Sequence, residues 1–188
     1  MRYFTDETTR SIIRDTYGNP RTGARAVAEA LYGAEDLSAI PEDAVALAFG
    51  VGHPVRYARL RPGEVVLDVG CGAGMDALLA ARQVGAEGRV LALDMMPAML
   101  ERTRRHAAQA RFTNVETREG LMEALPFAEA SVNVVISNGV LNLSTRKSRA
   151  LAEMHRVLRP GGRVCLADLV LDEDLPEEIV KNPTALAV

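Results

Sequence analysis

The chain has 188 residues, which is enough for one domain with its own hydrophobic core. Apolar residues make up 48% of the chain and charged residues 25%, which is ordinary for a globular protein. The formal net charge of -3 excludes a strongly basic character, so we expect neither nucleic acid nor an anionic membrane as a partner.

The two cysteines, Cys71 and Cys165, are too few for a disulfide framework and belong to no paired spacing, so we expect no metal site. Residues 1–7 contain no apolar core of a secretory signal. No apolar run approaches the roughly 20 residues that a membrane span needs. These observations together predict a cytoplasmic location.

Residues 1–61 are predicted to form a helical N-terminal arm. Apolar residues at helical spacing predict three helices there, over residues 5–16, 21–32 and 55–60. A short turn over 35–40 and a helical start at Pro41 follow the second helix. The segment 49–54 contains two glycines and a proline, so it is predicted to be a loop.

Residues 62–170 alternate between strand-like and helix-like segments. Five strands are predicted, over residues 64–69, 88–94, 114–118, 131–137 and 163–169. Three amphipathic helices are predicted, over residues 75–83, 97–110 and 145–158. The strands are nearly continuous apolar runs, as expected when helices cover both faces of a parallel sheet. We therefore predict an α/β fold with a doubly wound, mostly parallel, Rossmann-like sheet, followed by an acidic C-terminal tail over residues 171–188.

The first predicted strand of this domain leads into a loop with glycine at alternate positions. Gly70, Gly72 and Gly74 let the backbone approach a ligand closely, and the helix that follows presents free amides to it. The GxGxxG fingerprint of nicotinamide and flavin enzymes, counted from Gly70, would end at Met75, which is not glycine. Counted from Gly72 it would end at Ala77, which that fingerprint tolerates.

Asp94 ends the second predicted strand, at the position where folds of this kind bind ligands. Its carboxylate can accept hydrogen bonds from both ribose hydroxyls of an adenosine. NAD and S-adenosylmethionine share that ribose, so Asp94 indicates a nucleoside ligand without choosing between the two. The alternative interpretation is that Asp94 caps the helix predicted to begin at Pro97.

Four segments resemble, in the right order, the motifs of the class I S-adenosylmethionine-dependent methyltransferases: residues 68–74, Asp94, residues 131–138 and residues 156–163. The Pro-Gly-Gly turn at 160–162 is the most discriminating, because nicotinamide folds do not usually carry it. The resemblance implies S-adenosylmethionine as cofactor. The cofactor-binding residues that it implies are Asp68, Gly70, Cys71, Gly72, Gly74, Asp94, Met95, Leu121, Met122 and Asn138.

The chain is similar in particular to the arsenite methyltransferase subgroup, through segments 49–54, 77–85, 94–100 and 137–144. That subgroup holds As(III) on cysteine thiolates, because a soft metalloid prefers soft ligands. Val51 and Gly139 stand where two of those cysteines are expected. Methylation of a metalloid is therefore not expected for this chain.

Class I methyltransferases usually have seven strands, whereas the tail after the fifth predicted strand leaves no room for a helix and two more strands. Five of the seven strands are therefore predicted. The fifth would be an unpaired sheet edge, which proteins rarely leave exposed. A homodimer, a partner chain or a truncated chain would each account for it.

Methyl transfer from a sulfonium is an SN2 displacement, in which the protein mainly aligns the reactants and excludes water. The predicted function is therefore methylation of a small-molecule acceptor. His53 is the candidate general base, because imidazole titrates near neutral pH; the alternative is a loop residue packed against glycines. Asn142 is the other catalytic candidate, by orienting the acceptor, or else a turn former before Ser144.

Two other functions remain open at this point. One is a methyltransferase-like subunit that binds the cofactor but does no chemistry alone, which the missing strands favour. The other is an NAD-dependent oxidoreductase, against which the Pro-Gly-Gly turn and the lack of a Tyr-x-x-x-Lys pair argue.

Overall fold

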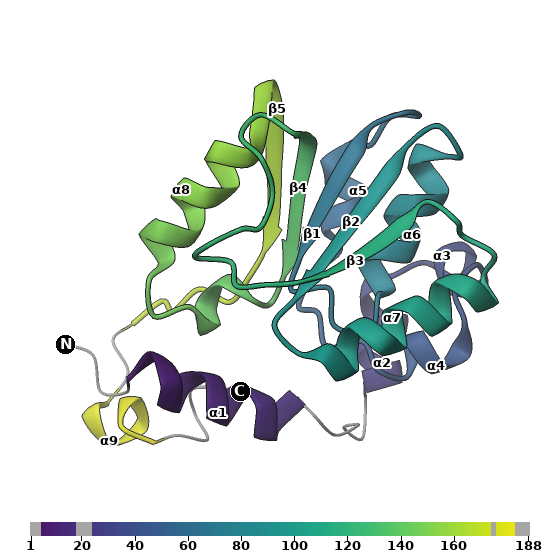
Figure 1. Ribbon diagram of the computed structural model, residues 1–188. Coiled ribbons are helices and arrows are strands. Elements are labelled where there is room, and N and C mark those ends of the chain that lie inside the picture. Colours follow the sequence, from purple (N-terminus) through teal and green to yellow (C-terminus); the bar gives the residue numbers. More distant parts are fainter. Residues whose placement is uncertain (1–4, 18–23, 174–175, 183–188) are drawn as a thin grey trace.

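The chain folds around one parallel sheet with the strand order β3-β2-β1-β4-β5 (Figure 1). The structure is a computed structural model that describes residues 5–17, 24–173 and 176–182. The strands are β1 (Val65–Val69), β2 (Arg89–Asp94), β3 (Val115–Glu119), β4 (Val132–Asn138) and β5 (Leu158–Ala167). Each neighbouring pair is parallel. The predicted doubly wound α/β fold with five strands is confirmed, and its sheet is parallel throughout.

Helices cover both faces of the sheet. The helices after β1 are α6 (Met75–Val84), α7 (Pro97–Gln109), the 3-10 helix η1 (Leu141–Leu143) and α8 (Lys147–Val157). Successive strand residues point to opposite faces. Val66 of β1 belongs to a buried cluster with α6 and α7, whereas Leu67 belongs to another with Met154 and Val157 of α8. Figure 1 shows α8 on one face, with α6 and α7 on the other.

Four short helices of the predicted arm pack on the same face as α6 and α7. They are α2 (Ala24–Leu31), α3 (Ala34–Ser38), α4 (Glu42–Val45) and α5 (Pro54–Ala58). Ala28, Val45 and Val55 are buried in the cluster that contains Val66 of β1. This segment is therefore part of a layer of the α/β body, and the domain boundary at residue 61 stays a prediction.

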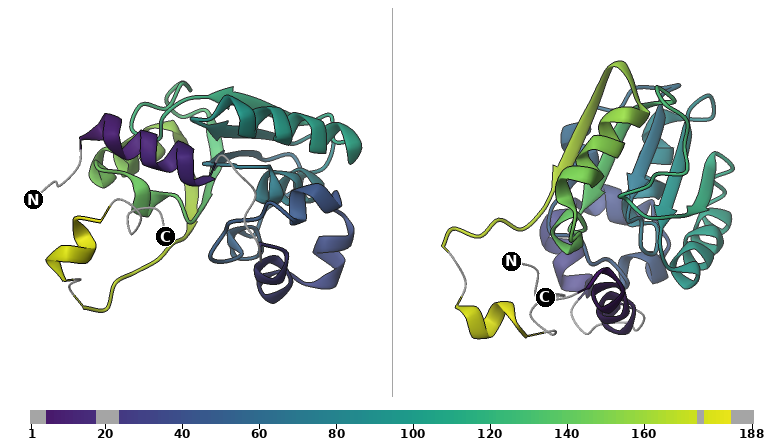
Figure 2. Two further views of the ribbon diagram at one scale, coloured as in Figure 1. Left: turned by 90° about the horizontal axis from the view of Figure 1, so that it is seen from below. Right: turned by 60° about the vertical axis from the view of Figure 1, so that its left-hand side comes forward.

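The first helix, α1 (Asp6–Tyr17), lies across the carboxyl ends of the strands (Figures 1 and 2). At its first turn, the Thr145 hydroxyl donates to the Asp6 carboxylate at 2.6 Å, and Arg146 pairs with that carboxylate at 2.5 Å. At its last turn, Tyr17 meets Phe49 edge to face, with ring centroids 5.7 Å apart. α1 therefore covers the end of the sheet where such folds bind ligands.

β5 begins earlier than its predicted start at residue 163. Leu158 pairs with Val132, and pairing resumes at Arg163 opposite Val134. The predicted Pro-Gly-Gly turn lies between these two pairs, as a bulge inside the strand. Among the described residues β5 pairs with β4 alone, and Val164 is 42% exposed.

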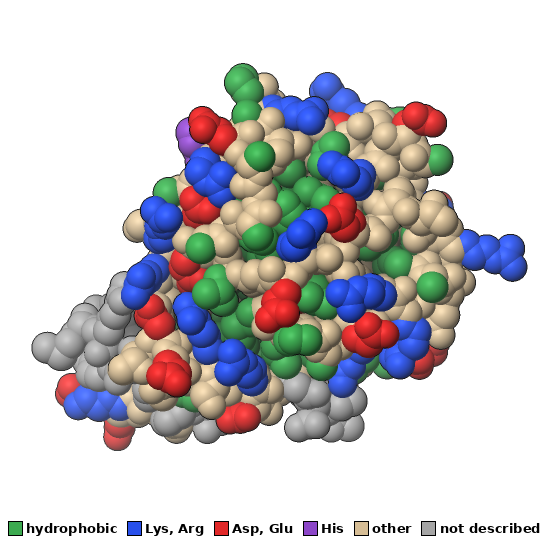
Figure 3. Space-filling view, in the orientation of Figure 1, with side chains coloured by type: hydrophobic (Ala, Val, Ile, Leu, Met, Phe, Trp, Pro, Cys, Tyr) green, Lys and Arg blue, Asp and Glu red, His purple; other side chains and the backbone are tan. Residues whose placement is uncertain are grey.

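The described part of the tail contains one short helix, α9 (Glu177–Val180), and residues 174–175 and 183–188 of the predicted tail lie outside the described residues. None of the described helices is long and apolar enough to cross a membrane. On the face that Figure 3 shows, acidic and basic side chains are interspersed. This face therefore carries no concentrated basic patch.

Candidate active site

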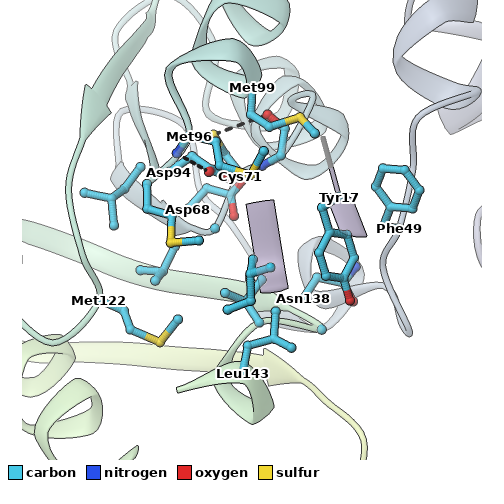
Figure 4. A pocket seen from close by; sticks show the side chains of 18 of the residues that line it. Tyr17, Phe49, Asp68, Cys71, Asp94, Met96, Met99, Met122, Asn138 and Leu143 are labelled. Carbon is cyan, nitrogen blue, oxygen red and sulfur yellow. Dashed lines mark hydrogen bonds between the residues drawn. The ribbon is translucent and has the colours of Figure 1, made fainter. Parts of the chain in front are cut away.

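A cavity of about 160 Å³ lies at the carboxyl ends of β1, β2 and β4, beneath α1 (Figure 4). The loop after β1, the ends of β2 and β4, the segment after β3 and one face of α1 form its walls. The predicted cofactor-binding residues that line it are Asp68, Gly70, Cys71, Gly72, Asp94, Met95, Leu121, Met122 and Asn138. The structure thus brings nearly all of that predicted set together. Gly74 is instead the N-cap residue of α6.

The glycine loop after β1 makes the sharp turn that its sequence predicts. Gly70, Gly72 and Gly74 have φ angles of 77°, 53° and 97°, a region that residues with a side chain rarely adopt. A Cβ atom at Gly70 would lie 2.5 Å from the Val140 side chain, so this position also has to be small. A Cβ at Gly72 would meet nothing within 4 Å. The loop therefore leaves open space beside a bare backbone.

Asp94 lies at the end of β2 with both carboxylate oxygens bonded to backbone amides. Oδ2 accepts from Gly72 N and Oδ1 from Met96 N, each at 2.9 Å. Met96 is the N-cap residue of α7, so Asp94 also supports the start of that helix. Burial raises the pKa of Asp94, and the amide hydrogen bonds partly offset this. Each oxygen keeps a second lone pair that can accept a ligand hydroxyl.

Asp68, in β1, adds a second buried carboxylate to the cavity wall. It is 2% exposed, and its Oδ2 has no hydrogen-bond partner among the described residues. Burial and the nearby carboxylates of Asp76 and Asp94 raise its pKa. An unpartnered buried carboxylate oxygen is costly, and a ligand cation or hydrogen-bond donor would remove that cost. The three carboxylates favour a cationic ligand at this wall.

Tyr32 and Asp76 line the cavity although the sequence reasoning did not select them. The Tyr32 hydroxyl donates to Asp76 Oδ1 at 2.9 Å. Burial and the Asp76 carboxylate raise the pKa of Tyr32, so this phenol stays protonated. Asp76 lies in the first turn of α6, where the helix dipole favours an acid, and that position was the available signal. Tyr32 is far away in the chain and carried no comparable signal.

Asn138, at the end of β4, joins the arm to the α/β body. Its Oδ1 accepts from Val51 N at 2.8 Å and from Gly52 N at 3.1 Å. Its Nδ2 is within bonding distance of Gly52 O, Asp76 Oδ2 and Tyr32 Oη, at 2.8, 2.9 and 3.0 Å. The amide is thus engaged within the protein while it borders the cavity, and its role toward a cofactor stays a prediction.

His53 lies in the arm loop and is 7% exposed. Its Nε2 lies 3.1 Å from Asp36, and its Nδ1 accepts from Arg56 N at 3.4 Å. Its ring packs against Tyr32 with centroids 4.3 Å apart, and it is not among the described residues that line the cavity. This placement favours the packed loop residue over the general base, and the catalytic role stays a prediction.

Asn142, the other catalytic candidate, lies in η1 outside the set of described cavity residues. Its backbone amide donates to Asp168 Oδ2 at 3.1 Å. Its side-chain Oδ1 is buried without a hydrogen-bond partner among the residues that the structure describes. The structure therefore brings neither catalytic candidate to the cavity wall.

A parallel sheet with this strand order, a glycine loop after β1 and an acid at the end of β2 are features of the α/β folds that bind nucleotides at the carboxyl ends of their strands. The methyltransferase domain family matches residues 60–187, and the chain belongs to this family. The family prediction is therefore confirmed.

Individual relatives support the same family. An arsenite methyltransferase of Halobacterium salinarum is 44% identical over 155 residues, which cover 82% of this chain and 39% of that protein. A ubiquinone/menaquinone biosynthesis C-methyltransferase of Marinomonas sp. is 39% identical, covering 66% of this chain and 49% of that protein. The crystal structure of an arsenic (III) S-adenosylmethionine methyltransferase from Chlamydomonas reinhardtii is 35% identical with a TM-score of 0.63, covering 86% of this chain and 53% of that one.

The chain thus spans less than half the length of these curated relatives. S-adenosylmethionine is the cofactor of the related structures, and the cavity fits it in three respects. Asp94 has lone pairs free to accept hydroxyls, the glycine loop allows close backbone approach, and the unpartnered carboxylate oxygen of Asp68 suits a compound that carries positive charge.

Proposed function

We propose that this chain is the catalytic domain of an S-adenosylmethionine-dependent methyltransferase that acts on a small-molecule acceptor in the cytoplasm. The observation that carries the proposal is the cavity in which Asp68, Asp94 and the glycine loop meet beneath α1. The relatives named above include methyltransferases of arsenite and of quinones, which are small acceptors. The face that Figure 3 shows carries interspersed charges and no concentrated basic patch of the kind that binds nucleic acid.

When bound, S-adenosylmethionine supplies a methyl group on a positively charged sulfur that a nucleophile displaces in one SN2 step. In the proposed mechanism Asp94 holds the ribose by accepting its hydroxyls. Asp68 lies in β1 beneath the glycine loop and favours positive charge in the cavity. α1 and the Phe49 loop cover the cavity and exclude water. These residues act by positioning and by electrostatics, which is what this chemistry needs from a protein.

A metalloid acceptor does not suit this chain. Val51 and Gly139 lie against each other, because a Cβ atom at Gly139 would be 3.5 Å from Val51 Cγ1. The place where the resemblance puts two thiolates is thus apolar. Cys71 is buried in the cofactor loop, which raises its pKa and keeps it a thiol. The Cys165 thiol donates to Pro54 O at 3.3 Å. Neither cysteine offers a free thiolate at the cavity.

A second candidate is a domain that depends on a partner chain, or on a second copy of itself, for activity. The edge of β5, which no other described strand pairs with, favours it: Val164 is 42% exposed, and Leu169 beyond the strand is 53% exposed. A related structure, 28% identical with a TM-score of 0.55, is a complex between the Haloferax volcanii Trm112 methyltransferase activator and a putative methyltransferase. Light scattering on the purified chain, with and without cofactor, distinguishes a monomer from a dimer.

Calorimetric titration of the 188-residue chain with S-adenosylhomocysteine, and separately with NAD, tests the cofactor assignment. We expect saturable binding of the first compound only. Asp94→Ala should weaken it by about 10- to 100-fold, because a hydrogen bond to a charged group contributes about 1.5–3 kcal/mol. Glu119→Ala is the matched control, since Glu119 ends the neighbouring strand β3 but is exposed. Binding of NAD in preference to S-adenosylhomocysteine would refute the proposal.

A further inference from the structure

One face of α1 forms the roof of the cavity. Its described lining residues, Asp6, Thr9, Arg10, Ile13 and Tyr17, recur at three- and four-residue spacing, which places them on one side of a helix. These residues and Asp94 line the same cavity, so the space beneath this face adjoins the part that Asp94 bounds. α1 therefore builds a subsite that the α/β body does not supply alone.

The end of this subsite is aromatic and apolar. Figure 4 shows Tyr17 and Phe49 together at one end of the cavity, away from Asp94 and Met122. The two rings lie at an interplanar angle of 79° and line the cavity together with Leu47. Such a wall suits the edge or face of another aromatic ring.

Thr9 carries the one buried hydroxyl among the described residues of α1 that lacks a hydrogen-bond partner. Thr9 is 3% exposed, lines the cavity and has an Oγ1 without a hydrogen-bond partner among the described residues. A hydroxyl can both donate and accept, and a buried one is normally bonded. The unsatisfied Thr9 oxygen therefore points to a ligand hydroxyl or carbonyl in the cavity.

The charged groups that line the cavity beneath α1 are of two kinds. The carboxylate of Asp6 is bonded to Thr145 and Arg146, and that of Glu123 accepts from the Ser144 hydroxyl at 2.5 Å. Arg10 is the only cationic side chain among the described residues that line the cavity. The carboxylates of Asp6 and Glu123 are thus already bonded within the protein, and Arg10 favours an electron-rich oxygen of the ligand.

We propose that the acceptor is a small aromatic compound with a ring hydroxyl, bound between α1 and the loop after β4 with its hydroxyl on Thr9 and its ring against Tyr17 and Phe49. That this compound accepts a methyl group rests on the proposed methyltransferase function. The subsite itself rests on α1, so its occupation can be measured by binding, without methyl transfer.

The probe is 4-ethylphenol, titrated into isotopically labelled chain saturated with S-adenosylhomocysteine and followed by NMR shifts. Ethylbenzene, which lacks the hydroxyl, is the companion probe. We expect 4-ethylphenol to bind at least tenfold more tightly than ethylbenzene. Thr9→Val should abolish that preference while leaving affinity for S-adenosylhomocysteine within twofold. Thr8→Val is the matched control, because Thr8 is the exposed neighbour on the same helix.

Absence of 4-ethylphenol binding, or an unchanged preference in Thr9→Val, would overturn the proposal. Tyr17→Leu gives a second test, because it keeps Thr9 and should weaken both probes. Equal affinity of both probes for the Tyr17→Leu variant and the unaltered chain would also overturn it. If S-adenosylhomocysteine fails to bind, the proposed function fails, and the same titration without it still decides whether the phenol subsite exists.

Discussion

The Asn138→Ala substitution removes the side chain that fastens the arm loop to the α/β body. In the structure this amide accepts from the amides of Val51 and Gly52 and reaches Gly52 O, Asp76 and Tyr32 with its nitrogen. The expected result is a large loss in the free energy of unfolding, because partners on three separate segments lose bonds at once.

The magnitude follows from the geometry. Asn138 Oδ1 accepts two hydrogen bonds, and its two amide hydrogens are shared among three acceptors. These contacts therefore amount to about four hydrogen bonds of about 1 kcal/mol each. The site is partly exposed, which lowers the total to about 3 kcal/mol. Asn133→Ala is the matched control: it lies in the same strand, and its Oδ1 accepts one bond, from Val65 N at 2.8 Å, so about 1 kcal/mol is expected.

Urea unfolding measures the loss of unfolding free energy in both variants, with the slope of free energy against urea concentration held the same. Equal losses for Asn138→Ala and Asn133→Ala would refute the reasoning. A third variant sharpens the test, because a Cβ atom at Gly50 would lie 2.2 Å from Asn138 Nδ2. Gly50→Ala should destabilise the unaltered chain but cost little more in the Asn138→Ala background, since the colliding amide is then absent.

Three further results are expected. Gly70→Ala should abolish binding of S-adenosylhomocysteine in calorimetry, because the new Cβ atom would lie 2.5 Å from the Val140 side chain. Gly72→Ala has open space and should cost only about 1 kcal/mol of backbone strain in melting experiments. Equal effects of the two substitutions would contradict this expectation. Arg163→Lys should lower the free energy of unfolding by about 2–3 kcal/mol, because the ammonium group of lysine cannot replace the guanidinium bonds to Ala58 O, Arg59 O and both oxygens of Glu64. An unchanged free energy in urea unfolding would show that these bonds add no stability. The Arg156 guanidinium holds the pKa of Glu153 below its usual range, so the stability that this ion pair adds is complete above the unfolded pKa of about 4.3 and is lost as pH falls through the lower folded value. The unfolding free energy of Glu153→Gln should therefore fall less steeply below about pH 4.3 than that of the unaltered chain. Parallel curves for the two proteins would contradict the assignment.

Much of the fold could be predicted because it depends on local patterns. The alternation of apolar strands with amphipathic helices predicts the parallel sheet, and the glycine loop predicts the sharp turn after β1. The start of β5 was predicted too late, because a Pro-Gly-Gly segment looks like a loop. In the structure Leu158 pairs before that segment and Arg163 after it, a register that only the neighbouring strand β4 determines.

The residues of the cavity were likewise predictable only in part. Its glycines and Asp94 were predictable because they follow strand ends directly. Tyr32 was not, because it follows α2 and reaches Asp76, 44 residues further along the chain, only in the folded structure. His53 was selected for the pKa of imidazole, whereas its location depends on Asp36 and Tyr32, which occupy its ring edge and face. Which side chains border a cavity is a tertiary property that local residue patterns do not contain.

The position of β1 in the middle of the sheet has a consequence for how the chain is made. Val66 pairs with Val90 on one side and with Val134 on the other. During synthesis the first partner follows β1 after a single helix, but the second emerges only after β2, α7 and β3. Non-local parallel pairings form slowly, and incomplete sheets aggregate through their free edges. A nascent chain shorter than residue 132 therefore exposes an edge of β1 that the finished protein conceals.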